Sequence, residues 1–152
     1  MAYAVALFSL YTNEIQMTEV TTPTSRLAAI KAGVEAIQGV AAGESNFETA
    51  TDPELARQLE AFGPAYECAD AIELTATGFA IAHFSLYTRQ LTMTSDATVA
   101  NRIEAIKAGV ESIQGLAAGE SLFETATDAD RARKIAAFGP AYECADALEI
   151  VI

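Results

Sequence analysis

The most reactive side chains recur in a ten-residue stretch, FGPAYECADA, which occurs identically at residues 62–71 and 138–147. Alternation along a strand would place a hydroxyl, a thiol and a carboxylate on one side, from Tyr66, Cys68 and Asp70. Three such groups facing one pocket could bind a small molecule. The matching residues of the second stretch are Tyr142, Cys144 and Asp146. A structural role is the other interpretation, with a buried thiol, a tyrosine hydroxyl in water and an aspartate that caps a helix or bonds a backbone amide.

Nucleophilic catalysis by cysteine requires a histidine base within hydrogen-bond reach of the thiol. The chain has one histidine, His83, and alternation along its strand points it to the sheet face opposite Cys68. The first copy carries Leu7 at the matching position, so any chemistry of this histidine would occur once. A partly exposed histidine on the sheet surface is the simpler interpretation. We therefore predict no catalytic residues, and the sequence favours a protein that is not an enzyme.

A second shared block, AAGESxFETATD, carries three carboxylates in each copy. In the first copy these are Glu44, Glu48 and Asp52. Oxygen ligands of this kind could gather a calcium ion, but their even spacing fits no calcium-binding loop and Asp52 is needed as a helix cap. The glycines of GVAAGES follow a helix instead of opening one, so they form no phosphate-binding loop. The sequence therefore predicts neither a metal site nor a cofactor.

The whole chain repeats itself. A shift of 76 residues aligns 3–76 with 79–152 without a gap and gives 46 identities in 74 positions. This pattern predicts a tandem duplication, with one unit over residues 1–76 and a second over 77–152. The period is long for a solenoid repeat and short for an independent domain, so we predict two half-folds fused into one domain.

Extended segments open and close each unit. In the first unit they lie at residues 6–12, at 14–20 and from Tyr66 onward. A two-residue turn at Thr12 and Asn13 would gather apolar side chains on one face of the hairpin. Those side chains form the pairs Leu10 with Ile15 and Phe8 with Met17.

Two helices are predicted between these strands, which gives each unit the order ββααβ. The first begins after a Thr22 cap and ends at Gly43, and glycines at positions 33 and 39 inside it indicate close approach to a neighbouring element. The second starts at Asp52, buries Leu55, Leu59 and Phe62, and stops at Gly63 and Pro64.

We predict an α+β fold in which the two units share one pseudo-twofold antiparallel sheet. Only TATG separates the last strand of one unit from the first strand of the next, so these strands would pair, with Leu74 opposite Ala80. Six strands would then form one sheet with all helices on the face that carries Ile72 and Leu74, and the other face would be open. Two separate three-stranded units joined at TATG are the alternative.

Composition excludes several classes of protein. Hydrophobic residues make up 51% and charged residues 20% of the 152, which is not typical of a disordered chain, and no apolar run reaches membrane-helix length. A net charge of −12 disfavours nucleic acid as a partner and suits either solubility or recognition of a basic surface. Two cysteines without an export signal predict a cytoplasmic protein with free thiols and no membrane partner.

The predicted open sheet face is too apolar to stay without a partner. The first functional hypothesis is therefore a non-enzymatic protein-interaction or self-associating module, with a homodimer as the expected assembly. Its interaction face would comprise Leu7, Ser9, Tyr11, His83, Ser85 and Tyr87. One alternative is a small-molecule binding protein or small enzyme with its site near the pseudo-twofold axis, at the Tyr66 and Tyr142 trios. Another is an acidic inhibitor of a basic protein.

The two units differ in charge. The first has 11 acids and 3 bases and the second 10 and 6, which gives −8 and −4. The changes concentrate at the hairpin tip and in the predicted second helix. There Asn13, Glu14, Leu55, Gln58 and Glu60 become Arg89, Gln90, Arg131, Lys134 and Ala136. These surfaces are where the units could have acquired different partners, and drift on a solvated face is the alternative.

Overall fold

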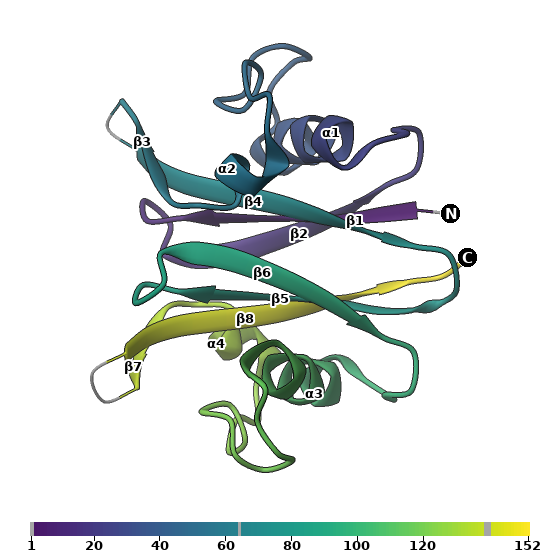
Figure 1. The fold of residues 1–152 in the computed structure, drawn as a ribbon, viewed down its shortest axis with the longest axis vertical. Helices are drawn as coiled ribbons and strands as arrows, with labels where there is room; N and C mark the ends of the chain where they lie inside the picture. Colours follow the sequence, from purple (N-terminus) through teal and green to yellow (C-terminus); the bar gives the residue numbers. More distant parts are fainter. Residues whose placement is uncertain (1, 64, 139–140) are drawn as a thin grey trace.

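The computed structural model describes residues 2–63, 65–138 and 141–152. The same order of elements, ββααββ, occurs in each half of the chain (Figure 1). The first half contains β1 (Ala2–Ser9), β2 (Glu14–Val20), α1 (Arg26–Gln38), α2 (Pro53–Ala56), β3 (Glu60–Phe62) and β4 (Ala65–Leu74). The second half contains β5 (Gly78–Ser85), β6 (Gln90–Asp96), α3 (Arg102–Gln114), α4 (Ala129–Ala132), β7 (Ala136–Phe138) and β8 (Ala141–Ile150).

The strands form two four-stranded antiparallel sheets, in the orders β2-β1-β4-β3 and β6-β5-β8-β7. Figure 1 shows four layers: α1 lies outside the first sheet, α3 lies outside the second, and the two sheets face each other in the middle. The predicted α+β class with antiparallel strands is confirmed, and each of the two sheets has helices on one of its faces. None of the described helices combines the length and the apolar character that a membrane crossing requires.

The predicted single six-stranded sheet is wrong, and the alternative of two separate sheets is closer. β4 pairs with β1 of its own half, with Leu74 opposite Ala2, and β8 pairs in the same way with β5. Residues 75–77 instead carry the chain from one sheet to the other, and the Thr77 hydroxyl accepts a hydrogen bond of 2.9 Å from the amide of Ile152. The physical reason is that β1 is buried on both faces, and one helix can cover only one of them.

The two faces of each sheet bury different sets of side chains. Facing the second sheet, the first sheet contributes Ala4, Ala6, Phe8, Ile15, Cys68 and Leu74. Facing α1, it contributes Tyr3, Val5, Leu7, Ala69 and Ala71. Phe8, Ile15 and Met17 therefore share a face, as the sequence predicts, but that face is covered by the other sheet and not by a helix.

Backbone hydrogen bonds join the two halves at two places related by the repeat. Leu59 N donates to Arg89 O and Leu91 N donates to Arg57 O, both at 2.8 Å. The matching bonds run from Ile15 N to Arg133 O and from Ile135 N to Asn13 O, also at 2.8 Å. We call these four bonds the inter-half seam. Each half thus supplies a short extended segment that pairs with the start of a strand in the other.

The β1–β2 hairpin has a longer loop than the predicted two-residue turn. Phe8 lies opposite Ile15, and residues 10–13 form the loop, which the Asn13 amide closes by donating to Ser9 O at 2.7 Å. Asn13 has a φ of 60°, a left-handed conformation that asparagine tolerates better than most residues. The predicted pairing was therefore two residues out of register, which leaves every side chain on its predicted face.

α1 begins later and ends earlier than predicted. Ser25, not Thr22, is the N-cap, because its hydroxyl accepts from the Ala28 amide at 3.1 Å. Gly39 ends the helix with a φ of 69°, so its role is a left-handed C-cap and not a close packing contact. The prediction for Gly33 is confirmed, because a Cβ built there would lie 2.4 Å from the Cβ of Val5 on β1.

α2 is a single turn and not the predicted longer helix. Asp52 caps it as predicted, with its carboxylate accepting from the Glu54 amide at 2.9 Å. The chain leaves the helix after Ala56, so Leu55 is exposed, Leu59 joins the layer between the sheets, and Phe62 lies on β3. The predicted stop at Pro64 falls outside the described residues. The predicted last strand, in contrast, is confirmed as β4.

Candidate functional site

The structure does not bring the hydroxyl, thiol and carboxylate of the repeated stretch together into one site. Tyr66 is 44% exposed at the start of β4, and Cys68 is completely buried between the sheets. Asp70 is buried, and its carboxylate accepts hydrogen bonds from its neighbour's amide, Ala71 N, and from Arg26. The same arrangement holds in the second half for Tyr142, Cys144 and Asp146. The three groups thus occupy three different environments.

Cys68 and Cys144 are free thiols in one cluster of apolar side chains between the two sheets. Burial raises the pKa of both thiols far above the usual range, and the acids Asp70 and Glu67 raise that of Cys68 further. The thiolate is the nucleophilic form of cysteine, and a thiol with a raised pKa forms little thiolate near neutral pH. Neither cysteine is therefore expected to act as a nucleophile.

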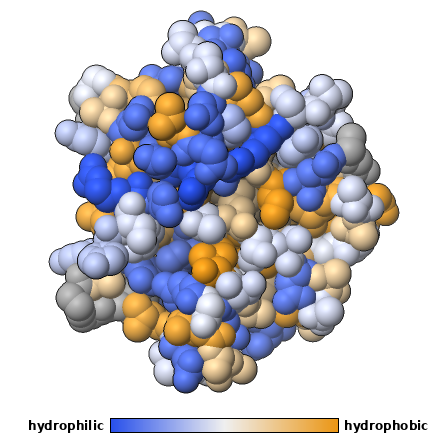
Figure 2. All heavy atoms as spheres, viewed as in Figure 1, coloured by the Kyte–Doolittle hydropathy of each residue, from blue (hydrophilic) through white to orange (hydrophobic). Residues whose placement is uncertain are grey.

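Asp70 and Arg26 form an ion pair in which Arg26 Nε lies 2.9 Å from Asp70 Oδ1. Arg26 also contacts Glu54 on α2, so one guanidinium ties the start of α1 to β4 and α2. Burial raises the pKa of Asp70, and the hydrogen bonds from Arg26 and Ala71 only partly offset that effect. Figure 2 shows hydrophilic side chains gathered over α2 and β4, where this network lies. Arg102, Asp146 and Asp130 repeat the network in the second half.

We expect Arg26→Gln to lower the free energy of unfolding by about 1–3 kcal/mol near neutral pH. This range is modest because the Arg26 side chain is itself 35% exposed, so water screens the pair. An acid whose pKa is raised by folding stabilises the folded state most at low pH, and this stability is lost as pH rises through the folded pKa. Without Arg26 the pKa of Asp70 rises further, so the deficit should grow with pH.

Urea unfolding at about pH 4 and about pH 7 measures this difference, because the ordinary pKa of aspartate lies near the lower value. In an Asp70→Asn/Glu54→Gln background, which removes both carboxylates that Arg26 contacts, Arg26→Gln should cost the same at both pH values. An equal cost at both values with Asp70 present would contradict the expected coupling.

A buried glutamate lies beside the C-terminal end of the long helix in each half. In the first half Glu67 accepts from Gln38 at 3.1 Å and from Asn46 at 3.2 Å. In the second half Glu143 lies within 3.5 Å of the Gln114 amide nitrogen and 3.1 Å from His83 Nε2.

Two linked substitutions explain the different partners of these glutamates. Asn46 becomes Leu122 and Leu7 becomes His83, so the second half loses one polar partner and gains another. Each buried carboxylate therefore keeps two side-chain partners, as a buried charge requires. His83 is only 5% exposed, so the expectation of a partly exposed surface histidine is wrong.

The open sheet face expected from the sequence does not exist, because α1 and α3 cover it. Of its predicted residues Leu7, Ser9, His83 and Ser85 are buried. Tyr11 and Tyr87 lie in the hairpin loops beyond the strand ends, where they are 87% and 89% exposed. The predicted interaction face is therefore split between the layer under the helices and two loop tips.

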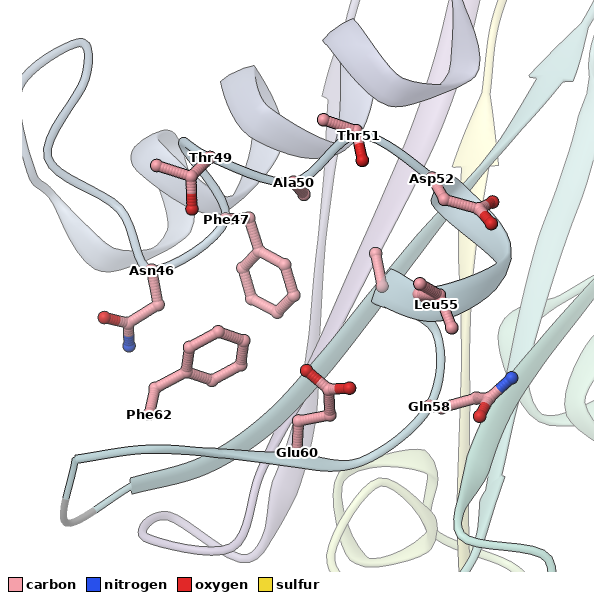
Figure 3. A pocket seen from close by; sticks show the side chains of 11 residues that line it. Asn46, Phe47, Thr49, Ala50, Thr51, Asp52, Leu55, Gln58, Glu60 and Phe62 are labelled. Carbon is pink, nitrogen blue, oxygen red and sulfur yellow. The ribbon is translucent and has the colours of Figure 1, made fainter.

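The first half contains a cleft that the sequence did not predict, between the loop 46–52, α2 and β3 (Figure 3). Its volume is about 200 Å³. The rings of Phe47 and Phe62 lie side by side at 5.1 Å, and Glu60 extends into the space beside them (Figure 3). The lining consists of Asn46, Phe47, Thr49, Ala50, Thr51, Asp52, Leu55, Ala56, Gln58, Glu60 and Phe62. We call this the first-half cleft.

The second half has a cleft at the equivalent place, with a volume of about 600 Å³. We call it the second-half cleft. It is lined by Leu122, Phe123, Thr125, Ala126, Thr127, Asp128, Arg131, Ala132, Lys134, Ile135 and Ala136. Phe123 is buried beneath it, with its ring edge-on to His83 at 6.4 Å. Among the described lining residues there is no histidine or cysteine, and no group of metal-ligating side chains gathers anywhere in the described part of the chain.

The sequence carries a signal for these clefts. The identical block AAGESxFETATD supplies their shared wall. The charge-changing positions in the predicted second helix line the clefts in both halves, at Leu55 and Arg131 and at Gln58 and Lys134. Comparison of the chain with protein-family models, curated proteins and solved structures finds no match.

Proposed function

We propose that the protein is a non-enzymatic small-molecule binding protein whose binding site is the second-half cleft. The observation that carries this proposal is the difference in size between two clefts formed by the same segments. At about 600 Å³ the second-half cleft falls in the range of about 300–1,000 Å³ that is typical of ligand sites. At about 200 Å³ the first-half cleft is smaller than that range.

The chemistry of the lining supports binding instead of catalysis. Leu122, Ile135 and Ala136 offer apolar surface above the buried Phe123, while Thr125 and Thr127 offer hydroxyl groups near it. Asp128 already accepts a hydrogen bond from the Asp130 amide at 2.9 Å as the cap of α4. Such a site, in which apolar surface lies beside several polar groups, can bind and orient a ligand without an activated nucleophile or base.

The other two functional hypotheses have less support. An interaction module that docks through an open sheet face lacks its surface, since α1 and α3 cover that face. Of its six expected residues, only Tyr11 and Tyr87 in the hairpin loops are exposed. The acidic inhibitor rests on the net charge of −12 alone, which is also common in soluble proteins.

The proposal is tested with N-phenyl-1-naphthylamine, an uncharged aromatic probe that fluoresces in apolar sites. We expect saturable binding of one probe per chain at the second-half cleft, because this cleft is about three times as large as its first-half counterpart. Ala126→Trp, which places an indole in that cleft, should weaken probe binding by about tenfold or more, equivalent to about 1.4 kcal/mol.

Ala50→Trp in the first-half cleft is the matched control and should leave probe binding unchanged. Thermal midpoints show whether each variant still folds. Absence of probe binding to the wild type, or equal binding to the wild type and Ala126→Trp, would overturn the proposal.

A further inference from the structure

The two clefts carry opposite charge although the same segments form them. The charged residues lining the first-half cleft are Asp52 and Glu60, which sum to −2. Those lining the second-half cleft are Asp128, Arg131 and Lys134, which sum to +1. The whole chain has a net charge of −12, so the positive lining of this cleft is opposite in sign to the charge of the molecule.

The basic groups of the second-half cleft are available to a ligand. The neighbouring Arg133 is occupied by Glu14 and Asp130, and Arg102 is occupied by Asp130 and Asp146. Arg131 and Lys134, in contrast, form no ion pair or side-chain hydrogen bond with any residue in the described ranges. Cations that lack protein partners at the edge of an apolar cleft can form charge-assisted hydrogen bonds with an anion.

The apolar floor restricts what kind of anion fits. Leu122, Phe123 and Ile135 line the same cleft, together with three alanines. An inorganic ion would leave this surface exposed to water, whereas a molecule with an apolar body would bury it, at roughly 25 cal/mol per Å². The arrangement therefore suits a molecule with a charged end and an apolar end.

We propose that the second-half cleft binds an amphiphilic organic anion, with a carboxylate, sulfonate or phosphate group at Arg131 and Lys134 and an apolar body over Phe123. This inference rests on the proposed function and names its ligand class. The first-half cleft has Leu55 and Gln58 at the two basic positions, and the Glu60 carboxylate beside them would repel an anion. Only one of the two clefts is therefore suited to this ligand.

The test compares two probes that share one ring system. 8-Anilinonaphthalene-1-sulfonate carries a sulfonate, and N-phenyl-1-naphthylamine is its uncharged counterpart. The variant Arg131→Leu/Lys134→Gln installs the residues that the first half has at these positions. We expect it to weaken binding of the sulfonate probe by about tenfold or more, because charge-assisted contacts are lost. Binding of the uncharged probe should change by less than about twofold on the same scale.

A matched control, Arg89→Asn/Lys107→Gln, removes two positive charges from residues outside the cleft lining. It should leave binding of both probes unchanged. Equal weakening of the sulfonate probe in both double variants would show a general charge effect and overturn the inference. Unchanged binding of the sulfonate probe to Arg131→Leu/Lys134→Gln would also overturn the inference. In that case, binding of the uncharged probe to the wild type would still support the proposed function. If neither probe binds the wild type, the proposed function itself fails.

Discussion

Replacement of Phe8 by alanine is expected to lower the free energy of unfolding by about 3–5 kcal/mol, the cost of removing a buried phenylalanine. Phe8 and Phe84 are completely buried and stack with ring centroids 3.9 Å apart and planes 8° apart. Both rings lie between the two sheets. The cavity left by the missing ring would therefore be bounded by strands, which cannot easily move together to fill it. Thermal unfolding followed by circular dichroism should show a midpoint lower by roughly 10 °C.

Phe84→Ala should have a similar effect, because the two rings are partners in one stack. Tyr11→Ala, at an 87% exposed position of the adjacent loop, is the control and should change stability by less than about 0.5 kcal/mol. A loss below about 1 kcal/mol for Phe8→Ala would contradict the packing of the two sheets through this layer.

Gly33→Ala is expected to destabilise the protein by at least about 1–3 kcal/mol, although alanine is the better helix former. The new Cβ would lie 2.4 Å from Val5 Cβ and 2.5 Å from both of its methyl groups, so α1 would have to move away from the sheet. Gly109→Ala should do the same at α3, where the new Cβ would meet Ile81 Cγ2 at 2.5 Å. Urea unfolding of the two variants measures both costs.

Gly39→Ala separates this effect from backbone strain. Gly39 has a φ of 69° and open space where a Cβ would lie, so alanine there should cost only about 1 kcal/mol, the penalty of a left-handed conformation. If Gly33→Ala is neutral or stabilising, helix and sheet are not in the close contact described here.

Side-chain alternation was predictable, but the layer that covers each face was not. The pattern placed Phe8 and Ile15 on one face and Leu7 on the other, as the structure has them. Both sets are apolar, so nothing local distinguishes the face under a helix from the face under a second sheet. The predicted pairing of β4 with β5 was wrong because local sequence also leaves the path of a short connection open. Such a connection can join neighbouring strands of one sheet or cross from one sheet to another.

The end of α2 was not predictable from local sequence. Leu55, Leu59 and Phe62 have helical spacing, but each lies in a different environment. The segment after Ala56 is held extended by Arg57 O and Leu59 N, which bond to the other half of the chain. Partners so distant in sequence leave no periodic signal, whereas the Asp52 cap depends on its immediate neighbours and was predicted correctly.

Identity between the copies indicated structure more than function. The repeated FGPAYECADA supplies most of strand β4, a buried thiol and the buried carboxylate of an ion pair, and each half of the fold uses all three. The candidate ligand site was marked instead by positions that differ, and no local pattern showed that Arg131 and Lys134 line the same cleft as Phe123.

The connection at residues 75–77 determines which halves can assemble with each other. If the halves were separate chains, the shared inner layer would allow each to pair with its own kind as well as with the other. Joined in one polypeptide, they meet at a high effective concentration and in a fixed ratio of one to one. Every molecule therefore carries one basic and one acidic cleft, an asymmetry that a dimer of identical subunits could not encode.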